Sequence, residues 1–130
     1  MGTKMESDLQ KKLTNELEKF QGLQKDHQKY IKARQVLDGQ LSENTLVKEE
    51  LDRVESSSNV YKMIGPVLVK QDIAEAKEVV QKRIDYISGE VKRHETMIKD
   101  LDQKQESQKE VLQKLQTQFQ QMQQKVAAKS

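Results

Sequence analysis

The side chains that could carry out chemistry are few in kind and scattered along the sequence. The chain has two histidines, His27 and His94, and no cysteine, so disulfides and thiolate metal sites are excluded. Neither histidine has a further metal-ligating residue at a suitable spacing, and we interpret both as polar interruptions of an apolar stripe. Carboxylates and lysines are abundant but are expected on solvated helix faces, where nothing desolvates them for acid–base work. With no phosphate-binding loop or nucleophile motif, the sequence predicts a protein that is not an enzyme and needs no cofactor or metal.

Composition limits the fold class. Charged residues make up 34% of the chain and hydrophobic residues only 34%, which favours an elongated helical protein or disorder over an ordinary globular core. The mean hydropathy of −0.92 predicts no membrane-spanning stretch, and no signal-peptide core is visible. A net charge of +2 without a concentrated basic face predicts no nucleic-acid binding. We therefore expect a cytoplasmic protein that contacts neither membranes nor nucleic acid.

The second half of the chain carries a regular apolar repeat. Alternate steps of 3 and 4 residues from Ile84 meet an apolar side chain at ten of thirteen positions, which is typical of a coiled-coil seam. The thirteen positions are Ile84, Ile87, Val91, His94, Ile98, Leu101, Gln105, Gln108, Leu112, Leu115, Phe119, Met122 and Val126. Upstream, Ala76, Val80 and Ile84 follow one another at spacings of four, a stutter that locally unwinds a supercoil.

The first half fits the same template less closely. Eight of its thirteen seam positions are apolar. The repeat supports a long helix in this half that pairs with the helix of the second half. These positions are Leu9, Leu13, Glu16, Phe20, Leu23, His27, Tyr30, Arg34, Leu37, Leu41, Asn44, Lys48 and Leu51. We predict helices over about residues 7–54 and 72–127, and their similar lengths favour an antiparallel hairpin whose ends meet at one tip.

Capping signals support the two helix starts. Ser7 precedes Gln10 by three residues, and Asp72 precedes Glu75 by three, which is the spacing of a capping box. The polar run Ser56–Asn59 competes with helix by bonding its own backbone, so it is expected to end the first helix.

Residues 59–70, between the helices, do not read as a simple loop. Val60–Ile64 and Val67–Lys70 are rich in β-branched and apolar residues and are separated by Gly65 and Pro66. Glycine can take the positive φ of a tight hairpin turn, and proline stops a helix at this point. We therefore predict one domain, residues 1–130, of a mainly α class: a long antiparallel two-helix coiled-coil hairpin with a single β-hairpin at the helix–helix connection.

The predicted strand pair is apolar on both faces. Its seven apolar side chains are Val60, Tyr61, Met63, Ile64, Val67, Leu68 and Val69. Two helix ends can cover one face and no strand edge, and an open apolar edge promotes aggregation. We therefore expect hairpins from several chains to pair into a larger sheet or barrel. The alternative is a turn packed against its own helices, which would have to hide all seven side chains.

The segment from Asn59 to Gln71, NVYKMIGPVLVKQ, closely resembles the hairpin of β-type prefoldin subunits. Further similarity lies in Gln40–Asn44, Val47–Leu51 and Lys82–Ile87, and the resemblance covers essentially the whole chain. The hairpin segment is specific, whereas the heptads alone would match many unrelated proteins. One hairpin in the chain, rather than two, is typical of the β-type.

The resemblance implies a hexamer of two α-type and four β-type subunits, so the partners of this chain would be two α-type and three further β-type subunits. In that family the hairpins form a double β-barrel base from which six coiled coils extend. Without ATP, their tips capture unfolded proteins such as actin and tubulin and deliver them to the cytosolic chaperonin. On this basis the residues of the hairpin, including Gly65 and Pro66, would direct assembly.

Candidate client-binding residues lie near the expected tip. They are Leu9, Leu13, Leu17, Leu112, Leu115, Phe119, Met122 and Val126. A few partly exposed apolar groups bind weakly at one site, but several arms acting on one unfolded chain gain through effective concentration. Apolar residues at heptad spacing also serve as seam residues, and Leu17, which lies off the strict register, is the better candidate for exposure.

Two other functions remain open. A tether that only bridges partners fits the heptads equally well but gives no reason for the apolar hairpin at residues 59–70. The other is a homo-oligomeric coiled coil whose halves pair between chains.

Overall fold

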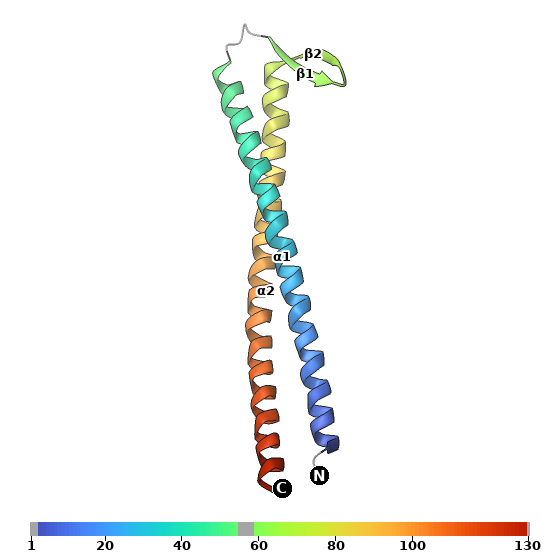
Figure 1. Cartoon of the computed structure of the whole chain (residues 1–130). Helices are drawn as coiled ribbons and strands as arrows, with labels where there is room; N and C mark the ends of the chain where they lie inside the picture. Colours follow the sequence, from blue (N-terminus) through green and yellow to red (C-terminus); the bar gives the residue numbers. More distant parts are fainter. Residues whose placement is uncertain (1–2, 55–58, 130) are drawn as a thin grey trace. The chain divides into compact units, whose positions relative to one another are not determined.

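The computed structural model describes residues 3–54 and 59–129 and confirms the expected fold class. Its elements are helix α1 (Thr3–Arg53), strand β1 (Val60–Ile64), strand β2 (Val67–Gln71) and helix α2 (Ile73–Lys129) (Figure 1). Most of the polar run that was expected to end the first helix, residues 56–58, lies outside the described residues.

The chain divides into two compact units. The terminal unit consists of residues 1–31 and 96–130, and the hairpin unit consists of residues 32–95. Within each unit, α1 and α2 run side by side in opposite directions (Figure 1). Hydrogen bonds join the two helices of one chain in both units, between Glu16 and Gln108 in one and between Arg34 and Glu95 in the other. The helices therefore pair within the chain and do not need a second copy as partner.

The seam of the terminal unit follows the predicted register. Ile98, Leu101 and Leu115 are buried, and the remaining predicted positions are partly buried, apart from Val126, which is exposed. The partly buried positions are Leu9, Leu13, Glu16, Phe20, Leu23, His27, Tyr30, Gln105, Gln108, Leu112, Phe119 and Met122. Because apolar side chains recur every three or four residues, each helix keeps its apolar stripe turned toward the other.

The hairpin unit contains the denser packing. Leu51, Ala76 and Val80 form a buried cluster, and Val60 and Ile84 pack against it. Two members of this cluster belong to the predicted stutter, so the spacing of four continues the apolar stripe up to the start of α2. Further along α2 the same stripe buries three more side chains of this unit, Ile87, Val91 and His94. On α1, the seam positions Leu37 and Leu41 are partly buried.

The sequence located the start of α2 correctly but placed the start of α1 too late. Asp72 caps α2, since its side-chain Oδ1 accepts a hydrogen bond of 2.7 Å from the backbone N–H of Ala74. In α1, by contrast, Ser7 lies inside the helix, which already begins at Thr3. The residues from Lys4 to Glu6 are good helix formers, and they extend the helix past the predicted cap.

The β-hairpin closes with a two-residue turn. Ile64 pairs with Val67 at the end of an antiparallel register, so Gly65 and Pro66 alone form the loop. Gly65 has a φ of 57°, which an L-residue rarely adopts and which a primed hairpin turn requires at its first position. Because Pro66 fixes its own φ at a negative value, the turn is of type II′.

Replacing Gly65 with alanine is expected to destabilise the protein by about 1 kcal/mol through backbone strain. An added Cβ would meet nothing within 4 Å, so steric clash does not contribute. The matched control is Gly89→Ala inside α2, where the Cβ also meets nothing and helix propensity predicts a gain of about 0.5–1 kcal/mol. Urea unfolding followed by far-ultraviolet circular dichroism measures both, and equal shifts for the two variants would contradict the strained turn.

Candidate functional site

The hairpin carries most of the exposed large apolar side chains that the structure describes in the hairpin unit. Six of its seven apolar side chains are between 43% and 72% exposed, and only Val60 packs against the helices. The six exposed residues are Tyr61, Met63, Ile64, Val67, Leu68 and Val69. The alternative of a turn buried against its own helices is therefore wrong for this chain. Large exposed apolar patches mark interaction surfaces or aggregation liabilities.

Both faces of the hairpin are apolar near its turn. The register places Ile64 beside Val67 on one face and Met63 beside Leu68 on the other. Within the described residues each strand pairs only with the other, so each also has one open edge of backbone N–H and C=O groups. The hairpin can therefore bind a partner through either face and through either edge.

A groove of about 190 Å³ joins the hairpin to the helices of the same unit. It is lined by Val47, Leu51, Val60, Tyr61, Lys62, Gln71, Ala76, Val79, Val80 and Arg83. Buried side chains of the core cluster line it together with the exposed side chains of Val47, Val79 and Tyr61, and Lys62 and Arg83 add positive charge. The groove extends the apolar surface of the hairpin onto both helices.

The predicted client-binding residues do not share one environment. Leu17 and Val126 are exposed, at 45% and 39%, whereas Leu115 is buried in the seam at 5%. The remaining five, Leu9, Leu13, Leu112, Phe119 and Met122, are partly buried between the helices. In this conformation the terminal unit therefore offers only part of the predicted set to a ligand.

Two exposed apolar residues of the terminal unit were missed by the sequence analysis. Met5 is 67% exposed and Val111 is 38% exposed. Both lie off the seam register, as Leu17 does, and that position was the signal that could have identified them. Single exposed apolar residues are common on protein surfaces, so these two do not by themselves define a site.

A polar pair interrupts the seam of the terminal unit. The side-chain amide of Gln108 donates to the backbone carbonyl of Glu16 at 2.8 Å and to its Oε2 at 2.6 Å. The hydrogen bond from Gln108 lowers the pKa of the Glu16 carboxyl below its ordinary value, and Lys19 contributes a smaller effect in the same direction. The two helices are thus joined by a charge-assisted contact at positions where apolar side chains would be expected.

The two histidines have separate surroundings. His27 approaches Asp102, with 2.7 Å between Nε2 and Oδ1, and joins the two helices of the terminal unit. His94 is buried in the hairpin unit, and its Nδ1 donates to the carbonyl oxygen of Glu90 at 2.7 Å. Among the described residues no group of three or more histidines and carboxylates could hold a metal ion.

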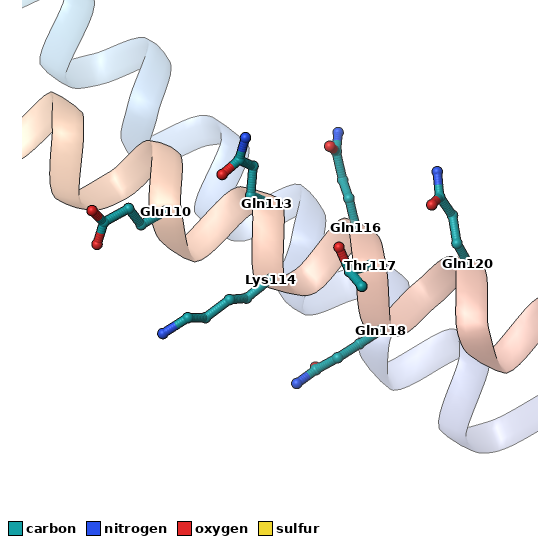
Figure 2. A pocket seen from close by; sticks show the side chains of 7 residues that line it. All are labelled: Glu110, Gln113, Lys114, Gln116, Thr117, Gln118 and Gln120. Atoms are coloured by element: carbon teal, nitrogen blue, oxygen red, sulfur yellow. The ribbon is translucent and has the colours of Figure 1, made fainter.

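A hollow on the outer surface of α2 is lined by seven mainly polar residues (Figure 2). They are Glu110, Gln113, Lys114, Gln116, Thr117, Gln118 and Gln120. All seven belong to the same helix, and their side chains point away from it on two sides (Figure 2). Such a surface encloses no small molecule, but its amides can exchange hydrogen-bond partners easily. In the part of the chain that the structure describes, neither helix is apolar enough over sufficient length to cross a membrane.

The family model described as prefoldin subunit matches residues 14–119. The chain belongs to the prefoldin family. It is 51% identical to prefoldin subunit 6 of Bos taurus over 115 residues, which cover 88% of this chain and 89% of the relative. It is also 47% identical to prefoldin subunit 6 of Arabidopsis thaliana, over 89% and 90% of the two chains.

The prefoldin fold is also found in a solved structure. The prefoldin beta subunit from Thermococcus strain KS-1 matches with a TM-score of 0.55, over 85% of this chain and 91% of that one. Its sequence identity is 20%, so this likeness concerns the fold alone. The resemblance found in the hairpin sequence is confirmed, and family membership supports the role of a chaperone subunit that assembles with other prefoldin subunits.

The Glu16–Gln108 pair predicts a pH dependence of stability. Because the pKa of Glu16 is lower in the folded chain, its contribution is complete above the ordinary glutamate pKa of about 4.3 and is lost as the pH falls through the folded value. The variant Glu16→Gln should therefore lose less stability than the parent chain when the pH falls from about 5 to 3.

Glu18→Gln provides the matched control, because it removes one negative charge from an exposed side chain of the same helix. Urea unfolding at several pH values measures how steeply the free energy of unfolding falls with pH for each chain. An equal fall for Glu16→Gln, the parent and the control would show that the contact with Gln108 does not stabilise the ionised form of the Glu16 carboxyl in solution.

Proposed function

We propose that this chain is a β-type subunit of a hexameric prefoldin, with two α-type and three further β-type subunits as its partners. The complex captures unfolded proteins such as actin and tubulin in the cytoplasm, without ATP or catalysis, and delivers them to the cytosolic chaperonin. The observation that carries the proposal is the hairpin of a prefoldin-family chain, which leaves six apolar side chains uncovered.

The hairpin supports assembly because burial of its surface requires other chains. Apolar surface contributes about 25 cal/mol for each Å² removed from water, so six exposed side chains favour association strongly. Open edges on both strands allow further strands to add by backbone hydrogen bonding. A simple tether between partners would need neither feature, so the exposed hairpin favours a subunit of a closed assembly.

Aspartate in place of Val67 or Val69 is expected to block assembly. Both valines are exposed in the single chain and share the face that also carries Ile64, so a carboxylate there would have to be buried unpaired in a barrel. Sedimentation of the chain mixed with its partner subunits measures the hexamer. The isolated parent chain should self-associate, and either variant should do so less.

Val36→Asp is the matched control, because Val36 is another exposed valine of the hairpin unit but lies on α1. It should leave the hexamer intact. A hexamer that forms normally with Val67→Asp or Val69→Asp would mean that the hairpin is not buried at a subunit interface.

Client capture is assigned to the terminal unit, whose predicted residues include the exposed Leu17 and Val126. An extended unfolded chain presents scattered apolar side chains, and a few exposed apolar residues on each of several arms bind it weakly and reversibly. The glutamines that line the hollow on α2 of the same unit can hydrogen-bond to the backbone of such a chain without selecting a sequence (Figure 2). Weak contacts of this kind also permit release.

Leu17→Asp should reduce capture while leaving assembly intact. Loss of one half-exposed leucine contact removes about 1 kcal/mol, so about fivefold more complex should be needed to suppress aggregation of a denatured protein. Leu46→Asp is the control, since Leu46 is an exposed leucine of α1 in the hairpin unit. Equal losses of suppression from the two changes would place the client surface outside the terminal unit.

A further inference from the structure

The hairpin carries positive charge and no negative charge. Residues 59–71 contain two lysines, Lys62 and Lys70, and neither aspartate nor glutamate. The register places Lys62 opposite Val69 on one face of the hairpin and Lys70 opposite Tyr61 on the other. Both lysines are exposed. Each face of the hairpin therefore combines apolar side chains with one positive charge.

A third cation extends this charge onto α2. Arg83 is exposed and lines the groove between the hairpin and the helices, as Lys62 does, and the described residues that line the groove include no carboxylate. The side chains of Lys62, Lys70 and Arg83 form no ion pair with any residue that the structure describes. Within this part of the chain, the three cations are therefore available to carboxylates of another molecule.

Two carboxylates of the adjoining helix ends are already engaged. Oδ1 of Asp52 lies 3.7 Å from Nζ of Lys77, and Oδ1 of Asp72 accepts the hydrogen bond from the backbone N–H of Ala74 that caps α2. Neither of them is among the groove residues. They leave the charge of the groove uncompensated.

The groove fits protein side chains better than a small molecule. Its volume of about 190 Å³ lies below the roughly 300–1,000 Å³ of small-molecule sites. Val47, Tyr61 and Val79 line it with exposed apolar side chains, and the cations lie beside them. An apolar segment that also carries a carboxylate would cover these side chains and form a charge-assisted hydrogen bond with Arg83 or Lys62.

A second copy of this chain is a poor occupant of the same surface. Its hairpin would bring two further lysines and no carboxylate, so every register of two such hairpins brings only like charges together. Like charges opposite each other destabilise a pair of strands, and opposite charges stabilise it. The apolar side chains still favour self-association, but a segment with carboxylates at these positions binds more tightly.

We propose that the hairpin and its groove bind an apolar, carboxylate-bearing segment of a neighbouring prefoldin subunit, and that Lys62, Lys70 and Arg83 select this partner over a second copy of the chain. The inference rests on the proposed function and deepens it, because it names the chemistry by which one subunit distinguishes a different subunit from itself. The apolar side chains supply the affinity of the contact, and the cations supply its specificity.

The first test is a competition for partner subunits. The double variant Lys62→Glu/Arg83→Glu is mixed with an equal amount of the parent chain and with limiting partner subunits, and mass spectrometry measures the share of each chain in the hexamer. The variant should be incorporated about tenfold less than the parent, because its new carboxylates repel those of the partner. At about 1 M salt, where the Debye length falls to about 3 Å, the two shares should approach equality.

Lys32→Glu is the matched control, because Lys32 is an exposed lysine of the hairpin unit that lies on α1. It should compete as well as the parent chain. All of these changes are at exposed positions, and circular dichroism confirms that the variants fold. Equal incorporation of the double variant at low salt would overturn the inference, and so would a preference for the parent that persists unchanged at about 1 M salt.

The second test uses this chain alone. The variant Lys62→Glu/Lys70→Glu reverses the charge of the hairpin, so its mixture with the parent should associate about tenfold more tightly than the parent associates with itself. Sedimentation at low salt measures both. Equal association in the two cases would show that the hairpin does not select by charge, which contradicts the inference.

The two tests separate the inference from the proposed function. A parent chain that forms no hexamer with any prefoldin subunits would refute the proposed function, whereas the measurement on single chains would still decide whether charge selects the partner. Normal hexamers of the parent together with equal competition by the double variant would leave the proposed function intact and refute the inference.

Discussion

The antiparallel seam is the contact on which the rest of this chain depends, because neither helix can bury its apolar stripe without the other. The helices have 51 and 57 residues, yet no described side chain is less than 2% exposed. A two-helix hairpin has a core only one row of residues deep, so each seam residue keeps some contact with water. Such a thin core tolerates polar residues, which explains how Glu16, Gln108 and His94 can occupy seam positions.

The connection between the helices has two consequences. Gly65 and Pro66 reverse the chain in two residues, and this reversal brings the two halves of the seam together. The same short turn leaves a strand pair too small to cover itself, since only Val60 reaches the buried cluster of the hairpin unit. The feature that completes the fold of one chain thus creates the surface through which, on our proposal, that chain joins others.

Much of this architecture could be predicted because it follows from local spacing. The alternation of 3 and 4 residues located the buried positions of both helices, and the Gly65–Pro66 pair located the turn. The start of α1 was predicted at Ser7, four residues too late, because helix propensity continues through Lys4–Glu6 without a strong stop signal. Helix boundaries are set by small energy differences that a capping motif alone does not decide.

The detailed environment of the candidate site could not be predicted from spacing. Leu115 and Leu17 are both leucines near a helix end, yet one is buried and the other exposed. The bonds from Gln108 to Glu16 and from His27 to Asp102 depend on how long side chains reach across the seam. Only the facing register of two distant segments determines such contacts. The bare heptad pattern therefore recorded Glu16 and Gln108 as interruptions and not as a pair.

The position of the turn at the middle of the chain also has a consequence for folding. Contacts near it close short loops, whereas Arg34 and Glu95 are 61 residues apart in sequence and Glu16 and Gln108 are 92 apart. The entropy lost on closing a loop grows with its length, so the hairpin unit has the advantage in forming first. Once a helix pair is aligned, each added heptad closes only a small further loop. The seam is therefore expected to zip from the turn toward the two chain ends, which places the terminal unit last to fold.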